Sequence, residues 1–562
     1  MVPIPEAAKK AKKDEGNTED EPGSAAPTEI LKAMSTPQEM LLHLSNQLNR
    51  HHLSRKIRIG IFDFYAALFN NLGSTWVENN FSLVVSHLLT EIVMYPRNQL
   101  NRYEALLTRK LVSILLRDLI GVRMLSEQGQ ITAIQELANN YLKRWPAMMP
   151  GKVAPTSPVL VVVLREVAGL LQQLGNAPPP VQDALADPLI TLLSHPSHSV
   201  RVNASWALRC FCYSTPLRLP KAILTVIEKL QRDLSTLLTP AASSEVPARA
   251  LGHAYGLAGL ISILPERPLY VSYDVSAKVL DMSTQLLKRA AEHDVAVAGV
   301  EIEVAWTLIS ALMSLGPNFV RPHLPQLLVL WRNALPKPTN KDAANNATRS
   351  VAEWVFLLHV RESALGAILS FLQFNSSTLV TLDVARRIAS VLSNALSFAN
   401  NFLSQNVEDP VDLQPQLAPR KGLTMRDREA LLRRRVYQCF SSLGFSSIAE
   451  STQLVLLQSA VSLFASPEGY AGSNVQAQIA SSSGTFTSVW HSTDGYAYGV
   501  TFNDIADFGG INAEGQQLAP NQDYLNRDSV EVSIETLVSR PVSSYNLGLT
   551  KALVSPSPLW SL

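Results

Sequence analysis

Two short motifs in this chain have the spacing of residues that do chemistry. Asp507-Phe-Gly509 matches the triplet with which protein kinases bind magnesium, but the chain lacks a His-Arg-Asp loop upstream, a Gly-rich phosphate loop and a strand lysine. His195 and His198 have a His-x-x-His spacing suited to a metal ion, yet no third ligand lies nearby in the sequence. We interpret the triplet as a chance match and the two histidines as part of a solvated turn between helices.

The basic clusters suggest binding chemistry. Arg433-Arg-Arg435, together with Arg426 and Arg428, is interpreted as a solvated helix face, and the alternative is a site for an acidic partner peptide. The run from Lys9 to Lys13 is interpreted as a solubilising tail, and the alternative is a nuclear address. The formal net charge is +1, from 48 basic and 47 acidic residues, so the balance indicates neither nucleic acid nor an anionic membrane as the main partner.

No paired carboxylates, Ser-His-Asp set or Cys-His set stands out, so the sequence predicts a protein that is not an enzyme and has no catalytic residues, cofactor or metal site. Cys210, Cys212 and Cys439 are too few for a disulfide framework and lack zinc spacing, which predicts free buried thiols. Three triplets match N-glycosylation sites in form only, because the chain shows no secretory signal: those at Asn203, Asn346 and Asn375.

A helical unit recurs between about residue 200 and residue 400. Each copy has a charged residue near its start, small residues near its middle and Leu or Ile on one face, so that a neighbouring helix can approach closely. The spacing of roughly 50 to 60 residues is near that of HEAT and armadillo repeats. The four copies cover residues 200–211, 249–260, 301–312 and 361–369, and their central alanines are Ala204, Ala254, Ala305 and Ala364.

A second amphipathic helix follows each copy, with apolar residues at intervals of three and four that fit a helix and not a strand. These stripes run over residues 223–237, 275–290, 324–335 and 384–398. A further stripe joins Ile57, Ile61, Phe64, Leu68 and Leu72, and all are interpreted as packing core. Prolines are expected between helices and outside helix interiors, for example Pro216, Pro220, Pro265, Pro268, Pro317, Pro322 and Pro336.

The sequence therefore predicts an all-α fold, an α-solenoid of HEAT/armadillo-like repeats over residues 29–465. Residues 1–28 are predicted to be a disordered N-terminal tail, and residues 466–562 a Ser/Gly/Asn-rich irregular or disordered segment. Hydrophobic residues make up 46% and charged residues 17% of the 562 positions, which fits helices covered on two sides by neighbours. The longest apolar runs, such as 158–164 and 251–264, are judged too short to span a bilayer.

Several stretches resemble a known family. Residues 199–211, 305–317, 320–333 and 109–121 have its pattern, and the resemblance extends from about residue 81 to 445. The chain resembles the HEAT-repeat-containing protein five family, whose members are large accessory proteins of clathrin-adaptor traffic. Because those members are several times longer, the resemblance implies that this chain is an N-terminal portion.

The resemblance implies a non-enzymatic scaffold that helps localise a clathrin adaptor complex and its cargo in vesicle traffic between endosomes and the trans-Golgi network. It implies a cytoplasmic location, on the cytosolic face of the trans-Golgi network, endosomes and clathrin-coated vesicles. Membrane contact is expected to be peripheral, through protein partners, and the concave surface of the array is expected to bind them. The alternative is a nuclear-transport receptor or a phosphatase-type scaffold. The partner-binding residues and self-association stay open.

Overall fold

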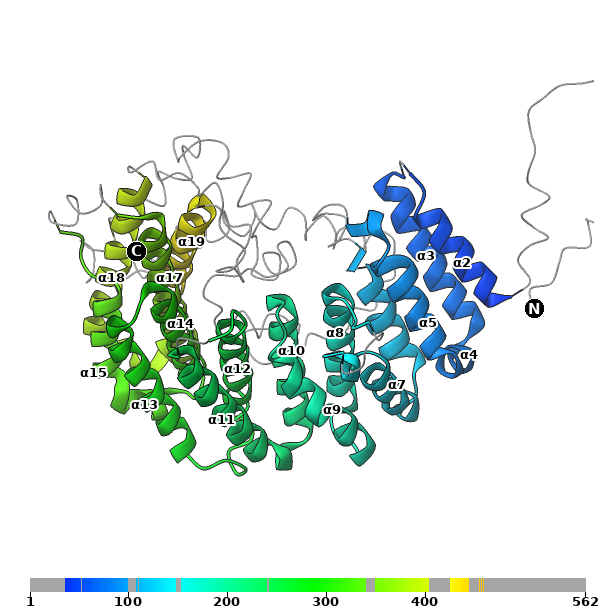
Figure 1. The fold of residues 1–562 in the computed structure, drawn as a ribbon, viewed down its shortest axis with the longest axis horizontal. Coiled ribbons are helices and arrows are strands. Elements are labelled where there is room, and N and C mark those ends of the chain that lie inside the picture. The colour runs from blue at the N-terminus through cyan, green and yellow to red at the C-terminus, as the bar shows by residue number, and fades with distance from the viewer. Residues whose placement is uncertain are drawn as a thin grey trace, which may run out of the picture.

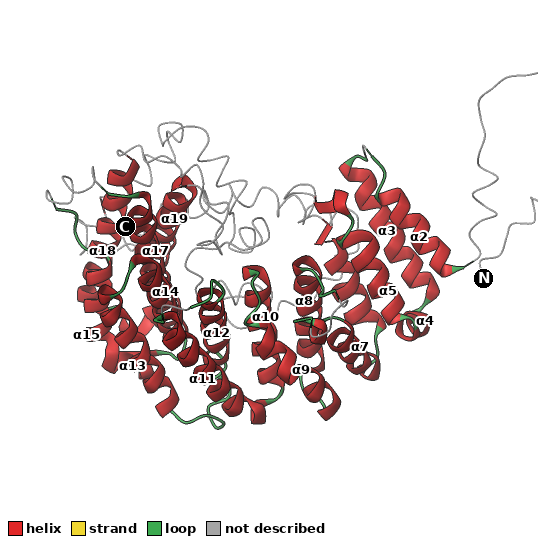
Figure 2. Cartoon of the chain, viewed as in Figure 1, coloured by secondary structure: helices red, strands yellow, loops and turns green. Residues whose placement is uncertain are grey.

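The chain folds into packed helices arranged as a crescent (Figures 1 and 2). The computed structural model describes residues 36–51, 53–99, 108–109, 111–147, 153–239, 242–339, 349–403 and 425–443, together with Leu454, Leu456 and Gln458. Within these residues every regular element is a helix. The all-α prediction is confirmed, and the arrangement is consistent with a helical solenoid.

The inner layer of the crescent contains the four predicted repeat copies. They belong to α10 (His198–Ser214), α12 (Val246–Ile261), α14 (Val295–Met313) and α17 (Val351–Leu379). Each of these helices packs against the next along the chain, and α8 (Ser157–Leu174) and α19 (Met425–Leu443) extend the layer at its two ends (Figure 1). The central alanines are fully buried, as expected for small residues at a helix seam: Ala204, Ala254, Ala305 and Ala364.

The outer layer contains the predicted second helices. They are α11 (Leu219–Leu237), α13 (Asp274–Arg289), α15 (Pro317–Ala334) and α18 (Leu382–Leu403), preceded in the chain by α9 (Pro179–Leu192). Their apolar stripes face the inner helices, so α11 packs on α12, α13 on α14 and α15 on α17. Inner and outer helices alternate along the chain in the order that the sequence patterns predict, and each outer helix packs on the inner helix that follows it.

The N-terminal part of the array is less regular. Its α-helices are α2 (Pro37–Leu48), α3 (Arg55–Leu72), α4 (Ser74–Asn79), α5 (Phe81–His87) and α7 (Glu127–Asn140). Two π-helical segments, η2 (Leu88–Val93) and η4 (Ile114–Met124), lie among them, with short 3₁₀ turns η3 (Pro96–Gln99) and η5 (Leu142–Arg144). The segment 109–121, one of the stretches that carry the family resemblance, is thus largely π-helical, and Leu111, Ile114 and Leu115 in it are buried.

Glycines allow the closest contact between helices. A Cβ at Gly252 of α12 would lie 1.8 Å from the Leu193 carbonyl oxygen, and a Cβ at Gly256 would lie 2.5 Å from Leu193 Cδ1. At Gly252 the neighbour is backbone, so only glycine fits without a shift of backbone, whereas at Gly256 it is the end of a leucine side chain. A Cβ at Gly60 of α3, in contrast, would meet no atom within 4 Å, so that glycine is not required by packing.

Two packing predictions are wrong. In the stripe over residues 57–72, Ile57 and Phe64 are 55% and 67% exposed, because α3 packs on α2, α4 and η4 with its other side. Pro322 does not lie between helices but within α15, as does Pro325. A proline inside a helix removes one backbone hydrogen bond, and this loss occurs on an outer helix next to water.

Other predicted segments fall where the structure gives no description. They are the predicted tails 1–28 and 466–562.

Candidate functional site

Buried carboxylates link successive helices of the inner layer. Glu303 of α14 accepts a hydrogen bond from Tyr255 Oη of α12 at 2.8 Å and lies 3.2 Å from His359 Nε2 of α17. Glu362 of α17 accepts one from Arg435 Nε of α19 at 2.9 Å. Both carboxylates are at most 1% exposed, so each depends on these partners to offset its lost hydration.

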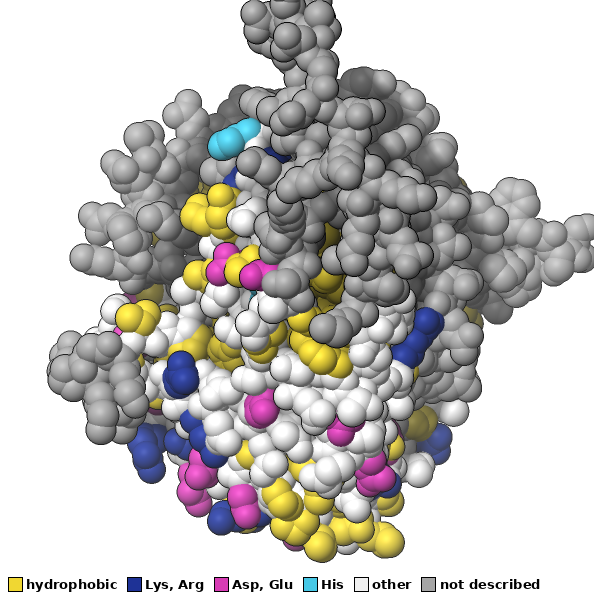
Figure 3. Space-filling model, turned by 90° about the vertical axis from the view of Figure 1, so that its right-hand side faces the viewer, with side chains coloured by type: hydrophobic (Ala, Val, Ile, Leu, Met, Phe, Trp, Pro, Cys, Tyr) yellow, Lys and Arg dark blue, Asp and Glu magenta, His cyan; other side chains and the backbone are white. Residues whose placement is uncertain are grey.

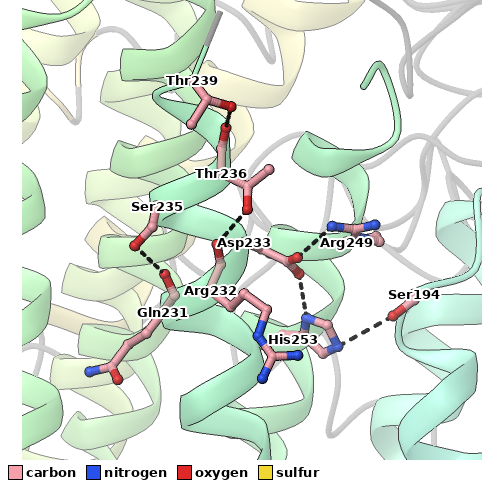
Figure 4. Close-up of polar contacts among 9 residues, drawn as sticks. All are labelled: Ser194, Gln231, Arg232, Asp233, Ser235, Thr236, Thr239, Arg249 and His253. Carbon is pink, nitrogen blue, oxygen red and sulfur yellow. Dashed lines mark hydrogen bonds and ion pairs between the residues drawn. The ribbon is translucent and has the colours of Figure 1, made fainter. Parts of the chain in front are cut away.

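A third buried carboxylate, Asp233 of α11, belongs to a row of three polar side chains (Figure 4). His253 Nδ1 of α12 lies 2.8 Å from Asp233 Oδ2, and Ser194 Oγ lies 3.3 Å from His253 Nε2. Arg249 donates to the other carboxylate oxygen at 2.8 Å. With Asp233 ionised, a proton on His253 Nδ1 points at the carboxylate, and the Ser194 hydroxyl lies within hydrogen-bond distance of Nε2.

Close helix packing brings this row together. Ser194 follows α9 in the turn that leads to α10, directly after Leu193. The absence of a side chain at Gly252 lets the Leu193 backbone touch α12, which places the Ser194 hydroxyl against the imidazole of the next residue, His253. Asp233 reaches the same imidazole from the outer helix α11, so the row joins α9, α11 and α12.

The electrostatics of Asp233 favour its charged form. Burial by itself would raise the pKa of this carboxyl group, but the hydrogen bonds and charges of His253 and Arg249 outweigh burial and hold the pKa below its ordinary value. Asp233 is therefore ionised at neutral pH. Its carboxylate fixes the orientation of the His253 imidazole and forms an ion pair with the Arg249 guanidinium.

The order of these bonds is that of a Ser-His-Asp triad. In a hydrolase the imidazole must also reach the leaving group of the substrate, because it returns the proton there. The His253 and Asp233 side chains are only 4% and 5% exposed, so the imidazole is closed off between helices. We interpret the row as a polar link that fixes the packing of three helices.

No short sequence motif marks the row of Ser194, His253 and Asp233. Its members are 20 and 59 positions apart, and no short motif spans such separations. The only signal was indirect: the second copy of the repeat unit contains His253 between the small residues Gly252 and Ala254. A polar side chain at such a close contact between helices is buried and therefore needs hydrogen-bond partners.

The interpretation of His195 and His198 as a solvated turn is wrong. Their residues are 5% and 3% exposed. His195 Nδ1 accepts from the Ser197 backbone N–H at 2.9 Å, and its ring lies 4.8 Å from that of Trp145. Burial and the nearby charge of Arg201 lower the pKa of His195 to about 4, so the imidazole is neutral at neutral pH. No cluster of three metal-ligating side chains occurs among the residues described.

The interpretation of the arginine cluster as a solvated face is also wrong. Arg433 and Arg435 are each 1% exposed. Arg433 pairs with Glu429 one turn earlier on α19 at 2.8 Å, and Arg435 bonds to Glu362. These two cations are matched by carboxylates of the chain itself, which explains their burial and leaves them no exposed charge for an acidic peptide.

The cysteine prediction is confirmed, because Cys210, Cys212 and Cys439 are free and buried. Burial raises the pKa of each thiol to about 12. The triplet asparagines Asn203 and Asn375 are at most 1% exposed and hydrogen-bonded inside the array, so neither amide is open to a glycosylating enzyme. The other motifs lie outside the described residues: Asp507-Phe-Gly509, Lys9 to Lys13 and Asn346.

Glu166 of α8 lines a small apolar void with room for about one water molecule. Its carboxyl group accepts from the Ser113 hydroxyl at 3.3 Å. Burial raises the pKa of Glu166 to about 7, although the nearby charges of Arg117 and Arg165 oppose the rise. The void is too small for an organic ligand, so Glu166 is a buried titratable group and not a binding site.

Three helices are long and apolar enough to cross a membrane by length and composition: α8, α14 and α17. The apolar run 158–164, predicted to be too short to span a bilayer, is part of a longer apolar helix, Ser157–Leu174. In the structure 61%, 72% and 78% of these three windows is buried, so their apolar surface is used in packing between helices.

No protein-family model and no solved structure matches the chain.

Proposed function

We propose that this protein is a non-enzymatic HEAT-like scaffold that binds protein partners. The observation that supports the proposal is the continuous inner layer α8–α10–α12–α14–α17–α19, in which one kind of helix is stacked repeatedly. Such an array builds an extended surface without a central cavity, and each added pair of helices adds docking area.

The exposed parts of the array are its outer helices and its turns. The inner helices α10, α12 and α14 are buried along nearly their whole length. Partner binding on the concave side of the array stays a prediction. Because the inner helices have little exposed surface, we propose that the outer helices and the turns make the contacts with partners. Many weak contacts along such a surface add up to a useful affinity.

The finer proposal follows from the resemblance to the HEAT-repeat-containing protein five family. In that proposal the scaffold acts in clathrin-adaptor traffic between endosomes and the trans-Golgi network, and its partners are the adaptor complex and accessory proteins. The alternative is a nuclear-transport receptor or a phosphatase-type scaffold. A net charge of +1 argues against the strongly acidic inner face that a transport receptor would use.

Affinity purification of the tagged full chain, followed by identification of its companions, tests the finer proposal. We expect clathrin-adaptor subunits at levels well above those in a control purification with an unrelated helical-repeat protein. Purified adaptor complex should then bind the purified chain saturably. Karyopherin cargo or phosphatase catalytic subunits in place of adaptor subunits would overturn the trafficking proposal in favour of its alternative.

The non-enzymatic part has its own test. Ser194→Ala removes the only hydroxyl in the Asp233 row, and we expect it to change no ester or amide hydrolysis by the purified chain. Turnover by the natural chain that Ser194→Ala abolishes, with partner binding retained, would show that the row is an active site.

A further inference from the structure

Large apolar side chains gather on one edge of the array. Leu217 lies in η6 (Pro216–Arg218), the turn between α10 and α11, and is 85% exposed. Leu269 lies in the loop between α12 and α13 and is 94% exposed, with Tyr270 and Tyr273 beside it at 41% and 60%. We call these four residues the rim patch. The α12–α13 loop reaches the lower edge of the crescent in Figure 1, and hydrophobic side chains also gather at the lower edge in Figure 3.

The two turns of the rim patch are neighbours. The Arg267 guanidinium lies 4.4 Å from the ring centre of Tyr213 at the end of α10, and Arg209 of α10 pairs with Glu266 at 3.3 Å. These contacts hold the α12–α13 loop beside the last turns of α10, which lead into the α10–α11 turn. The Tyr273 ring also packs edge-on against Phe319 of α15, 5.7 Å between centres, so the patch is fixed to the next pair of helices.

Some backbone groups in and beside the rim patch are hydrogen-bonded within their own turns. The N–H of Tyr270 donates to the Arg267 carbonyl, that of Arg267 to the Ile263 carbonyl, and that of Arg218 to the Thr215 carbonyl. A backbone group that is hydrogen-bonded within its turn costs less free energy to move out of water than an unpaired one.

The charges near the leucines are also compatible with an apolar partner. Glu266 is paired with Arg209, and Arg218 is paired with Asp183 at 3.1 Å. Lys221 and Asp274 are exposed but stand in the first turns of α11 and α13, behind the tips of the turns. Neither charge must leave water when the leucines do.

We propose that the rim patch inserts into the interface of a lipid bilayer. Leu217 and Leu269 enter the boundary of the acyl chains, and Tyr270 and Tyr273 lie at the level of the headgroups, where aromatic rings with a polar end are favoured. A bilayer accepts projecting side chains without a matching pocket, whereas a protein partner would require a packed pocket around each anchor. The proposal does not rest on the trafficking function.

The inserted surface is small, so the affinity is comparable to that of one myristoyl chain, with a partition constant on the order of 10⁴ M⁻¹. Such binding is useful only together with a second contact. It allows a scaffold held by partners to lie with one edge against the membrane. The attraction is hydrophobic, so neutral phosphatidylcholine should suffice and salt should have little effect.

The test uses the full chain and phosphatidylcholine vesicles at millimolar lipid. Leu269→Cys is labelled with an environment-sensitive NBD dye at neutral pH, where the buried native thiols react slowly. We expect a blue shift and a rise in fluorescence on addition of vesicles, unchanged at high salt. The matched control is Leu238→Cys, labelled in the same way at the other end of α11, where residue 238 is 43% exposed; its dye should not respond.

A second measurement uses the double variant Leu217→Ser, Leu269→Ser in vesicle flotation. We expect its partition constant to fall about a hundredfold, roughly tenfold for each leucine lost. The control variant Leu42→Ser, Ile57→Ser changes exposed apolar residues at the far end of the array and should bind like the natural chain. Each of these changes is on the surface, so circular dichroism should stay unchanged.

Three outcomes would overturn the proposal. The first is a dye at residue 269 that does not respond to vesicles. The second is vesicle binding that high salt abolishes and the double serine variant retains, which would indicate attraction to headgroups. The third is a chain that ignores vesicles but forms dimers that the double serine variant loses, which would show that the rim patch binds a second copy.

Discussion

The link from Asp233 to His253 and Arg249 predicts a large loss of stability when the carboxylate is removed. Asp233→Ala leaves the His253 imidazole, 4% exposed, without an acceptor for its Nδ1 proton, and it deprives Arg249 of its partner. Loss of hydrogen bonds to a charged group costs about 1.5–3 kcal/mol when a buried donor, here the His253 N–H, is left unsatisfied. We expect a loss of unfolding free energy in that range.

The variant Asp233→Asn should cost less. It keeps the shape and one acceptor, and His253 can change tautomer, so that Nδ1 accepts from the new amide and Nε2–H donates to Ser194. The ion pair with Arg249 is still lost, but its guanidinium is 33% exposed and regains water. We expect a loss of about 1–2 kcal/mol, near the value of a charged hydrogen bond.

The assay is urea unfolding followed by circular dichroism, together with hydrogen exchange of α11 and α12, because arrays of repeats unfold in segments. Glu228→Gln, an exposed carboxylate on the same helix, is the control and should change stability by at most about 0.5 kcal/mol. The reasoning is refuted if Asp233→Ala is as stable as Glu228→Gln. It is also refuted if exchange of α12 amides stays unchanged.

Three further predictions concern other buried groups. The pKa of Glu166 is about 7 in the fold and about 4.3 in an unfolded chain, so its stabilising contribution is complete below pH 4 and is lost as the pH rises to 7. Glu166→Gln should therefore match the natural chain at pH 4 and exceed its stability at pH 8, by up to about 3 kcal/mol in urea unfolding. Gly252→Ala should destabilise the fold by several kcal/mol because its Cβ meets a backbone oxygen, whereas Gly60→Ala should stabilise α3 by about 0.5–1 kcal/mol in thermal unfolding. Cys210, Cys212 and Cys439 should react with a thiol reagent at pH 8 only after denaturation, and prompt labelling of a native thiol would contradict their burial.

The sequence predicted the helices of the regular array well because their signal is local. The stripe over residues 223–237 and the small residues around Ala204 or Ala305 mark the seams directly. The wrong predictions concern side chains whose burial depends on which other helix packs beside their own. The stripe of Ile57 and Phe64 has a helical period, but no described helix covers that face of α3.

Polar positions were predicted less well for a related reason. Arg433, Arg435 and His195 look like surface residues in isolation, since charged and polar side chains usually face water. Their burial depends on partners from distant segments, such as Glu362, 73 positions before Arg435. A single sequence does not show these partners, so the row from Ser194 to Asp233 was equally hidden.

The buried carboxylates differ in how many helix interfaces they join, and this difference bears on the array as a unit. Asp233 joins the outer helix α11 to the inner helix α12, next to the turn that holds Ser194. Glu303, in contrast, contacts both Tyr255 of α12 and His359 of α17. Glu303 therefore spans three consecutive inner helices. In a stack where each repeat contacts only its neighbours, stability is a sum of interface terms. A group that belongs to two interfaces couples them, because opening either one removes one of the two partners of the same buried carboxylate. The inner layer is thus tied together across repeats by its buried charges, in addition to its apolar seams.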